Sequence, residues 1–212
     1  MVTMAEPHPL PGLDAACRAL ARGQAVVVPN PSPMTYGLVA TDPAAVNAAK
    51  GRPVEQPVAV SLHDHAEWHR VTPGLDLPRE LLPRILALLD RRLSLLVPVR
   101  EDASLPEWVR SGVHDGHLAM FNGRWGPSAP LWDRFPRLHG SSANRSGQPP
   151  AACAADAARM LGTDVPVIDG DALRDPRRVP RASSMVRVTR DGKMRLHRPG
   201  AQDVASIVDV SP

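Results

Sequence analysis

Cysteine, aromatic residues and long apolar stretches are all scarce in this sequence. The only cysteines are Cys17 and Cys153, too few for a disulfide framework, so we expect a reducing, cytoplasmic location. No apolar run approaches the roughly 18 residues that a membrane-spanning helix requires. Residues 1–12 also lack the hydrophobic core of a secretion signal. We therefore expect a soluble protein without a membrane partner.

Basic residues are plentiful, but almost all of them are of one type. Only Lys50 and Lys193 are lysines among the 25 basic residues, and the formal net charge is +3. Hydrophobic residues make up 43% and charged residues 22%, which is typical of a globular chain and excludes intrinsic disorder. The 24 prolines follow no period, which excludes a collagen-like repeat. The length of 212 residues suits a single domain.

Hydrophobic patterning predicts an alternation of helices and strands. Helices are expected over residues 14–22, 43–50, 78–92 and 151–162. Strands are expected over residues 25–28, 57–62, 93–99, 117–121, 137–141 and 165–169, and residues 183–188 and 193–198 flank a T-R-D-G hairpin turn. Because helices join most consecutive strands, the pattern predicts an α/β (or α+β) domain built on one sheet.

Three segments combine small, polar and basic residues. Residues 31–38, P-S-P-M-T-Y-G-L, follow a predicted strand where α/β sheets usually contact ligands, although composition alone favours a rigid proline-rich turn. Lys50-Gly51-Arg52 can converge on a phosphate or form a solvated helix end. Residues 140–147, G-S-S-A-N-R-S-G, can cradle a phosphate in a nest of N–H groups or form a polar turn.

Histidines and arginines gather in two further places. His63, His65 and His69 do not form an H-E-x-x-H pattern, so we interpret them as a polar helix start on the surface and expect no metal site.

Residues 174–198 carry nine basic side chains against two aspartates, a local charge of +7. Such a segment suits a nucleotide or RNA, with an ordinary arginine-rich surface as the alternative.

Taken in order along the chain, these segments resemble the YrdC-like family, the threonylcarbamoyl-AMP synthases. Residues 31–38 correspond to the family's P-T-D/E-T-x-Y-G-L, residues 50–52 to its K-x-R, and residues 142–144 to its S-x-N. Residues 182–186 match its P-S-T-V-V strand, and residues 198–201 its closing R-x-G-A. The resemblance implies one YrdC-like domain over residues 1–212, with a core over about 12–203 and short flexible termini. Its expected fold is a twisted mixed sheet with flanking helices and a basic concave cavity.

The resemblance also implies a reaction, in which ATP, bicarbonate and an amino acid give a carbamoyl-adenylate and pyrophosphate, with Mg²⁺ assisting, for use in tRNA modification. By the same resemblance, Lys50 and Arg52 are expected to be catalytic and to neutralise phosphate and carbamate charge. Residues expected to bind the nucleotide are Ser142, Asn144, Ser183 and Arg198. Residues expected in the amino-acid pocket are Ser32, Thr35 and Tyr36.

The departures from the family pattern concern mostly the amino-acid end. Pro33 and Met34 replace an acid and a threonine, and residues 118–122 lack the arginine of the family's R-x-P strand, which Arg124 replaces only if the chain shifts. A lost polar contact can decide specificity. We therefore expect an ATP-dependent nucleotidyltransferase that is a divergent paralogue, acting on a small amine or amino acid. The alternative is a non-catalytic protein that binds nucleotide or RNA, either double-stranded RNA or tRNA.

Overall fold

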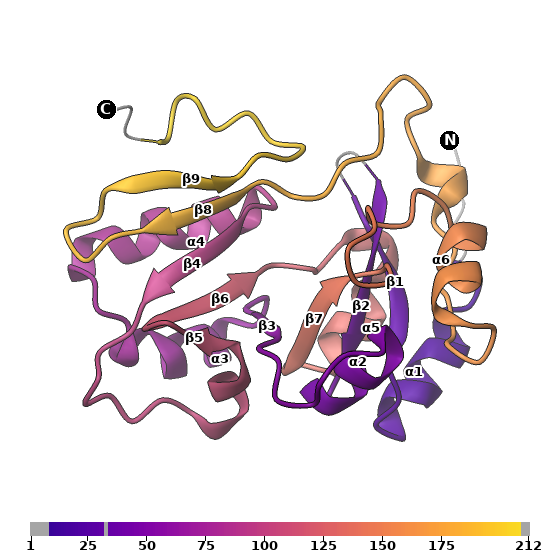
Figure 1. Ribbon diagram of the computed structural model, residues 1–212, viewed down its shortest axis with the longest axis horizontal. Helices are drawn as coiled ribbons and strands as arrows, with labels where there is room; N and C mark the ends of the chain where they lie inside the picture. The colour runs from indigo at the N-terminus through magenta and orange to yellow at the C-terminus, as the bar shows by residue number, and fades with distance from the viewer. Residues whose placement is uncertain (1–8, 32–33, 209–212) are drawn as a thin grey trace, which may run out of the picture.

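The computed structural model describes residues 9–31 and 34–208 of the chain. Within them, nine strands form one mixed sheet in the order β1-β2-β7-β3-β6-β4-β8-β9, with β5 paired to β6 (Figure 1). The strands are β1 Val26–Asn30, β2 Thr35–Ala40, β3 Ala59–Ser61, β4 Ser94–Pro98, β5 Val113–His114, β6 His117–Phe121, β7 Leu138–Ser142, β8 Met185–Val188 and β9 Met194–Arg198. The α-helices are α1 Leu13–Ala21, α2 Pro43–Lys50, α3 His65–Val71, α4 Leu82–Asp90, α5 Ala129–Arg134 and α6 Ala154–Leu161.

The two halves of the sheet are covered differently. Strands β1, β2 and β7 are buried on both faces: Val26 and Val28 pack in one cluster with α1 and α5, and Val27 packs in another with α2 and α6. Burial on both faces explains the continuous apolar run in the sequence. Strands β6, β4 and β8 pack with α3 and α4 on one face, so buried and half-buried residues alternate along them. Their other face is left open.

The two halves meet at β3, which has only three residues. Val60 lies between Met120 of β6, to which it is parallel, and His139 of β7, to which it is antiparallel. Farther along the chain, the segment between α6 and β8 crosses from the first half to the second (Figure 1). The strands of this second half therefore come from the middle and from the C-terminal part of the chain.

Three expectations about local structure need correction. Residues 165–169 do not form a strand, and Val167 makes only an isolated parallel bridge with Val27. The expected proline-rich connection at 31–38 is partly wrong, because residues from Thr35 onward form β2 and pair with β1 as a hairpin. The short helix α5 was not expected. In each case contacts with distant parts of the chain decide the conformation over local propensity.

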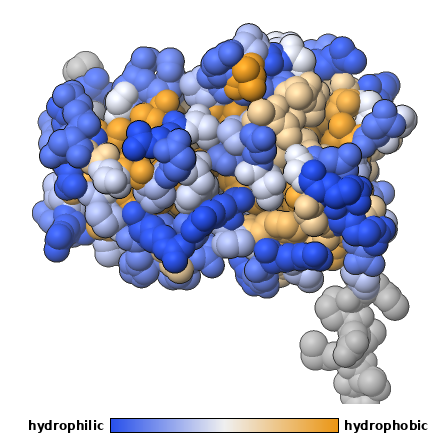
Figure 2. All heavy atoms as spheres, turned by 90° about the horizontal axis from the view of Figure 1, so that it is seen from below, coloured by the Kyte–Doolittle hydropathy of each residue, from blue (hydrophilic) through white to orange (hydrophobic). Residues whose placement is uncertain are grey.

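The surface of the molecule is largely hydrophilic on the face seen from below. Figure 2 shows hydrophilic side chains along the margins of this face, with hydrophobic ones exposed between them.

Of the three histidines interpreted as a polar helix start, His65 and His69 are exposed on α3, as expected, whereas His63 is only partly exposed. In the described ranges, every helix is too short or too polar to cross a bilayer.

His139 gives the fold a pH dependence. Its side chain is 2% exposed, and its Nδ1 lies 3.0 Å from Ser111 Oγ. Burial lowers the pKa of His139 to about 4 from its ordinary value of 6.5, so the folded state stays neutral where the unfolded state binds a proton. We expect the free energy of unfolding to fall by up to about 3 kcal/mol as the pH drops from 6.5 to 4. Urea denaturation across this range would measure the fall.

The control for this prediction is His139→Gln, which cannot titrate. Burial also lowers the pKa of His63, which adds to the same pH slope, so the variant should reduce the slope without abolishing it. An unchanged slope in His139→Gln would show that His139 is not the group responsible.

Candidate functional site

A cavity opens on the uncovered face of the sheet and extends over the seam between its halves. Its volume available to water-sized molecules is about 280 Å³, and it is open to solvent. Small residues on neighbouring strands form its floor: Gly37, Ala59, Ser94, Ala119 and Gly140. Gly140 pairs with both Val39 and Ala59, and a Cβ there would lie 2.5 Å from the Phe121 ring. The cavity therefore exists because larger side chains are absent from the centre of the sheet.

All charged side chains that line the cavity within the described residues are arginines. Arg52 Nε donates to Asn47 Oδ1 (2.6 Å), Arg92 Nη1 to the Asn122 carbonyl (3.0 Å), and Arg198 Nη2 to the Ser183 carbonyl (3.1 Å). Neither an aspartate nor a glutamate of the described chain pairs with any of the three. Their charge is thus available to a ligand, and the cavity is suited to an anion.

Arg52 is held in place by a buried asparagine that the sequence did not single out. Asn47 is fully buried on α2, and its Nδ2 donates to the carbonyls of Val54 (2.9 Å) and Gln56 (2.8 Å). Its Oδ1 remains for Arg52. Asn47 therefore fixes both the 51–56 loop and the orientation of the guanidinium. Burial lowers the pKa of Arg52.

Lys50 lies behind the wall of the cavity. Its side chain is buried, and its Nζ donates to the carbonyl oxygens of Ser142 (2.5 Å) and Asn144 (2.8 Å) and to Asn144 Oδ1 (2.8 Å). Burial, followed by the nearby Arg52 charge, lowers the pKa of Lys50 to about 8. Lys50 thus fastens the loop after β7 to the end of α2.

The structure brings Ser142 and Asn144 together with Lys50, but only Ser142 lines the cavity. Ser142 Oγ donates to Asn144 Oδ1 (2.5 Å), while Asn144 Nδ2 donates to the carbonyls of Arg145 (3.0 Å) and Gln148. The Asn144 side chain is therefore fully used inside the protein. Its geometry is that of a residue that shapes the loop.

Ser183 and Arg198 line the cavity where the segment before β8 and the end of β9 approach the end of β1. Asn30, at the end of β1, donates through Nδ2 to Ser183 Oγ (3.3 Å), a contact that sequence reasoning missed. Residues 198–202 lie against residues 182–184 so closely that a Cβ on Gly200 would be 2.4 Å from the Ala182 carbonyl oxygen. This close approach explains the glycine of the R-x-G-A match.

Of the residues expected in the amino-acid pocket, Thr35 and Tyr36 both line the cavity. Thr35 lines the cavity, and its hydroxyl makes no hydrogen bond to another described residue. The Tyr36 hydroxyl instead donates to Asp171 Oδ1 (2.8 Å) and accepts from the Gly170 N–H (3.1 Å), and burial raises the pKa of Tyr36. Ser32 and Pro33 lie outside the described residues. Met34 is buried, with its methyl group beside Gly170.

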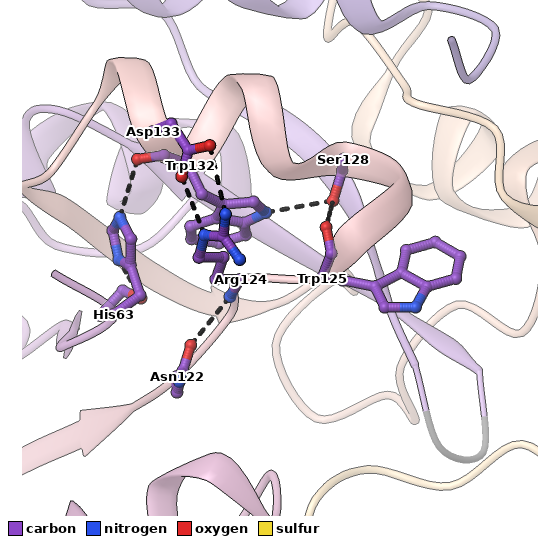
Figure 3. A network of polar contacts seen from close by, with 8 residues as sticks. His63, Asn122, Arg124, Trp125, Ser128, Trp132 and Asp133 are labelled. Carbon is purple, nitrogen blue, oxygen red and sulfur yellow. Dashed lines mark hydrogen bonds and ion pairs between the residues drawn. The ribbon is translucent and has the colours of Figure 1, made fainter. Parts of the chain in front are cut away.

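Arg124 does not supply the arginine that residues 118–122 lack. Its Nε and Nη2 donate to Asp133 Oδ1 (2.8 Å) and Oδ2 (3.2 Å), and its backbone N–H donates to Asn122 Oδ1 (3.0 Å), as Figure 3 shows. Trp132, beside this pair, lines the cavity, and its Nε1 donates to Ser128 Oγ (3.1 Å). The guanidinium that does enter this side of the cavity belongs to Arg92, which no sequence pattern indicated.

The basic segment 174–198 does not act as one patch. Ion pairs join four of its basic residues to aspartates: Arg174 to Asp171, Arg177 to Asp175, Arg190 to Asp76, and Lys193 to Asp191. Of the described basic side chains in this segment, Arg198 alone lines the cavity, while Arg187 lines a second hollow with His114, His117 and His197. The segment is therefore less available to a polyanion than its composition indicates.

The donor set of the cavity does not fit a magnesium ion held by the protein. Mg²⁺ prefers carboxylate oxygens, and none lines the cavity in the described part of the chain. Arginines would repel a bare cation. The residues present are suited to the phosphates of a nucleotide, with any Mg²⁺ arriving on those phosphates.

Comparisons with known proteins agree with the sequence resemblance. The family model Sua5_yciO_yrdC, described as "Telomere recombination", matches residues 18–200. A structure of P. abyssi Sua5 complexed with L-threonine is similar at 23% identity and a TM-score of 0.64, covering 89% of this chain and 54% of that one. This chain thus spans about half the length of that Sua5 chain.

Two further solved structures show the same fold. E. coli YciO is similar at 11% identity and a TM-score of 0.65, covering 92% of each chain. Full-length HypF in its phosphate- and nucleotide-bound form is similar at 19% identity and a TM-score of 0.64, covering 91% of this chain and 29% of HypF. A comparison with curated protein sequences gave no significant match. The expected mixed sheet with flanking helices is therefore confirmed.

Proposed function

The chain belongs to the Sua5/YciO/YrdC family, and from this premise we propose that it is an ATP-dependent nucleotidyltransferase. It joins ATP, bicarbonate and a small amine or amino acid into a carbamoyl-adenylate, in the manner of a threonylcarbamoyl-AMP synthase. The cavity lined by Arg52, Arg92 and Arg198 without a carboxylate carries this proposal, because it is built for a ligand with several negative charges. The ligands in the Sua5 and HypF structures, L-threonine and a nucleotide, support it.

The proposed reaction has two steps. The amine attacks bicarbonate with loss of water and gives a carbamate. A carbamate oxygen then forms a bond to the α-phosphorus of ATP as the bond to the pyrophosphate oxygen breaks. Negative charge accumulates on the phosphoryl oxygens during this transfer, so fixed cations and N–H donors lower the barrier.

The residues of the cavity have distinct proposed roles in this scheme. Arg52 neutralises phosphate or carbamate charge from the wall formed by α2, and Ser142 presents its hydroxyl beside it. Ser183 and Arg198 hold the nucleotide from the opposite side. Lys50 and Asn144 act through the loop that they fasten, because their polar atoms bond to that loop.

The amino-acid end is proposed to differ from that of a threonine-specific enzyme. Thr35 lines the cavity with a hydroxyl that pairs with no other described residue, but Met34 is packed in the protein interior and supplies no hydrogen bond to a substrate. A pocket that lacks a partner for a substrate hydroxyl discriminates weakly in its favour. We therefore propose that the preferred substrate is an amine or amino acid other than threonine.

The test is a substrate panel. The protein is incubated with α-labelled ATP, Mg²⁺, bicarbonate and individual amino acids or amines, and both pyrophosphate and the labelled adenylate are measured. We expect pyrophosphate release that requires bicarbonate and one member of the panel, and that exceeds the rate with threonine. Omitting bicarbonate is the control. Absence of pyrophosphate with every amine would contradict the enzymatic proposal, whereas threonine as the best substrate would contradict only the altered pocket.

Binding of RNA without catalysis is the second candidate function. Five arginines of the basic segment have no carboxylate partner in the described residues: Arg178, Arg181, Arg187, Arg195 and Arg198. Arginines without such a partner favour phosphate backbones. Salt-dependent binding of double-stranded RNA or tRNA, in a protein that releases no pyrophosphate, would favour this function over the enzymatic one.

A further inference from the structure

Arg92 has an unusual backbone conformation for its residue type. Its φ is +67°, and Asp115 is the only other non-glycine residue with positive φ in the described chain. Arg92 follows the last turn of α4, and its N–H donates to the Leu89 carbonyl (2.9 Å). Helices often end on a left-handed residue of this kind, and glycine is the usual choice because a Cβ is strained there. The chain therefore places a large side chain where a glycine would cost less free energy.

The Arg92 side chain is directed into the cavity and is only partly used by the protein. Nη1 donates to the Asn122 carbonyl (3.0 Å), which leaves Nη2 and Nε without a partner among the described residues. The neighbouring carboxylate of Asp90 accepts from Asn122 Nδ2 (2.9 Å) and makes no ion pair with Arg92. One hydrogen bond thus orients the guanidinium while its remaining N–H groups stay available. Burial lowers its pKa, as for Arg52.

Strand register places Arg92 near a second cavity arginine. Ser94, two residues after Arg92, pairs with Met185 of β8, and Met185 pairs with Arg198 of β9. Ser94, Met185 and Arg198 therefore lie in one row across three strands, and all three line the cavity. The Ser94 hydroxyl makes no hydrogen bond to another described residue. Two guanidinium groups and a free hydroxyl thus share one end of the cavity.

We propose that Arg92 is a substrate-binding residue whose guanidinium, together with that of Arg198, holds a carboxylate or phosphate group. Its left-handed backbone is the conformation that directs the side chain into the cavity, and the strain is tolerated for that reason, as at other functional sites. This inference rests on the proposed function because it takes the substrate to be an anion. It adds a residue that the family motifs do not contain.

The test compares Arg92→Gly with Asp115→Gly. Both replace a left-handed residue by glycine, but Asp115 lies in the β5–β6 turn and does not line the main cavity. Calorimetry measures the binding of pyrophosphate, ATP and L-threonine to each variant, and thermal denaturation measures stability without ligand. We expect Arg92→Gly to bind at least one probe tenfold or more weakly with an unchanged or raised melting temperature. Asp115→Gly should keep the affinity of the original protein.

Each outcome either shows which anionic group Arg92 binds, a phosphate or a carboxylate, or contradicts the proposal. Weaker binding of pyrophosphate and ATP by Arg92→Gly assigns the group to a phosphate, and weaker binding of L-threonine alone assigns it to a carboxylate. Unchanged affinity for every probe, or binding of none of them by the original protein, overturns the proposal. A lower melting temperature with unchanged affinity means that Arg92 serves only the fold. Because binding needs no turnover, a protein that releases no pyrophosphate but loses affinity in Arg92→Gly would refute the proposed reaction alone.

Discussion

Arg52→Ala is expected to lower kcat/KM for ATP by roughly 10²–10³-fold, the usual effect of removing a fixed donor from the charge that develops in a transition state. The guanidinium lines the cavity and makes one side-chain hydrogen bond to the protein, to Asn47 Oδ1. Losing that bond leaves one buried oxygen unpaired, which costs about 1 kcal/mol of stability. Activity should therefore fall far more than folding.

The measurement is steady-state release of pyrophosphate with the best substrate of the panel, alongside thermal denaturation. Arg124→Ala is the matched control, because it removes an arginine that pairs with Asp133 outside the cavity. Its kcat/KM should match that of the original protein. If Arg52→Ala retained kcat/KM within a few-fold, Arg52 would not be the cation that faces the reacting phosphate.

Lys50→Met is expected to destabilise the protein by roughly 1–3 kcal/mol and to abolish ligand binding through loss of the loop after β7. The substitution keeps the length and apolar stem of the side chain. It removes one donor from three oxygens. Asn144 Oδ1 keeps the Ser142 hydroxyl and the Ser142 carbonyl keeps the Asn144 N–H, so the Asn144 carbonyl is the oxygen left unpaired among the described residues. Each buried oxygen without a partner costs about 1 kcal/mol or more. Because Lys50 is buried, its loss affects the fold as well as the site.

Urea denaturation at pH 7 measures this loss. The other lysine is the control, since Lys193 is exposed in the β8–β9 turn and pairs with Asp191 (3.1 Å). Lys193→Met should change the free energy of unfolding by less than about 1 kcal/mol, as is usual for a surface ion pair. Loss of activity in Lys50→Met with unchanged stability would instead mean that Lys50 contacts substrate directly.

Much of the fold follows from local patterns in the sequence. The valine run at 26–28 indicates a strand buried on both faces, and the D-G pair at 191–192 marks the β8–β9 hairpin, with Gly192 at φ +83°. Strand β2 was harder to find, because prolines precede it and Gly37 interrupts its apolar pattern. It forms because β1 and β7 pair with it on either side. Such pairing depends on residues about a hundred positions away.

The site was predictable only where short motifs identify it. The K-x-R and S-x-N motifs led to residues that contact one another, but they did not show that Lys50 and Asn144 face away from the cavity. Arg92 was not predictable, since its position depends on a left-handed turn and on strand register. Tyr36 lines the cavity, but the hydrogen bond from its phenol to Asp171 was not predictable, because Asp171 lies far away in the sequence.

The shortness of β3 has a consequence for how the protein opens. All strand pairing between the two halves of the sheet passes through its three residues, and each half has its own apolar clusters. Because this ladder is short, we expect it to open at a lower free energy than the clusters on either side, with the halves opening as two cooperative units. Arg52 extends from one unit, and Arg92 and Arg198 from the other. An anion bound by all three arginines would link the two halves across that seam. Amide hydrogen exchange in β3 should then be slower when the anion is bound than when it is absent.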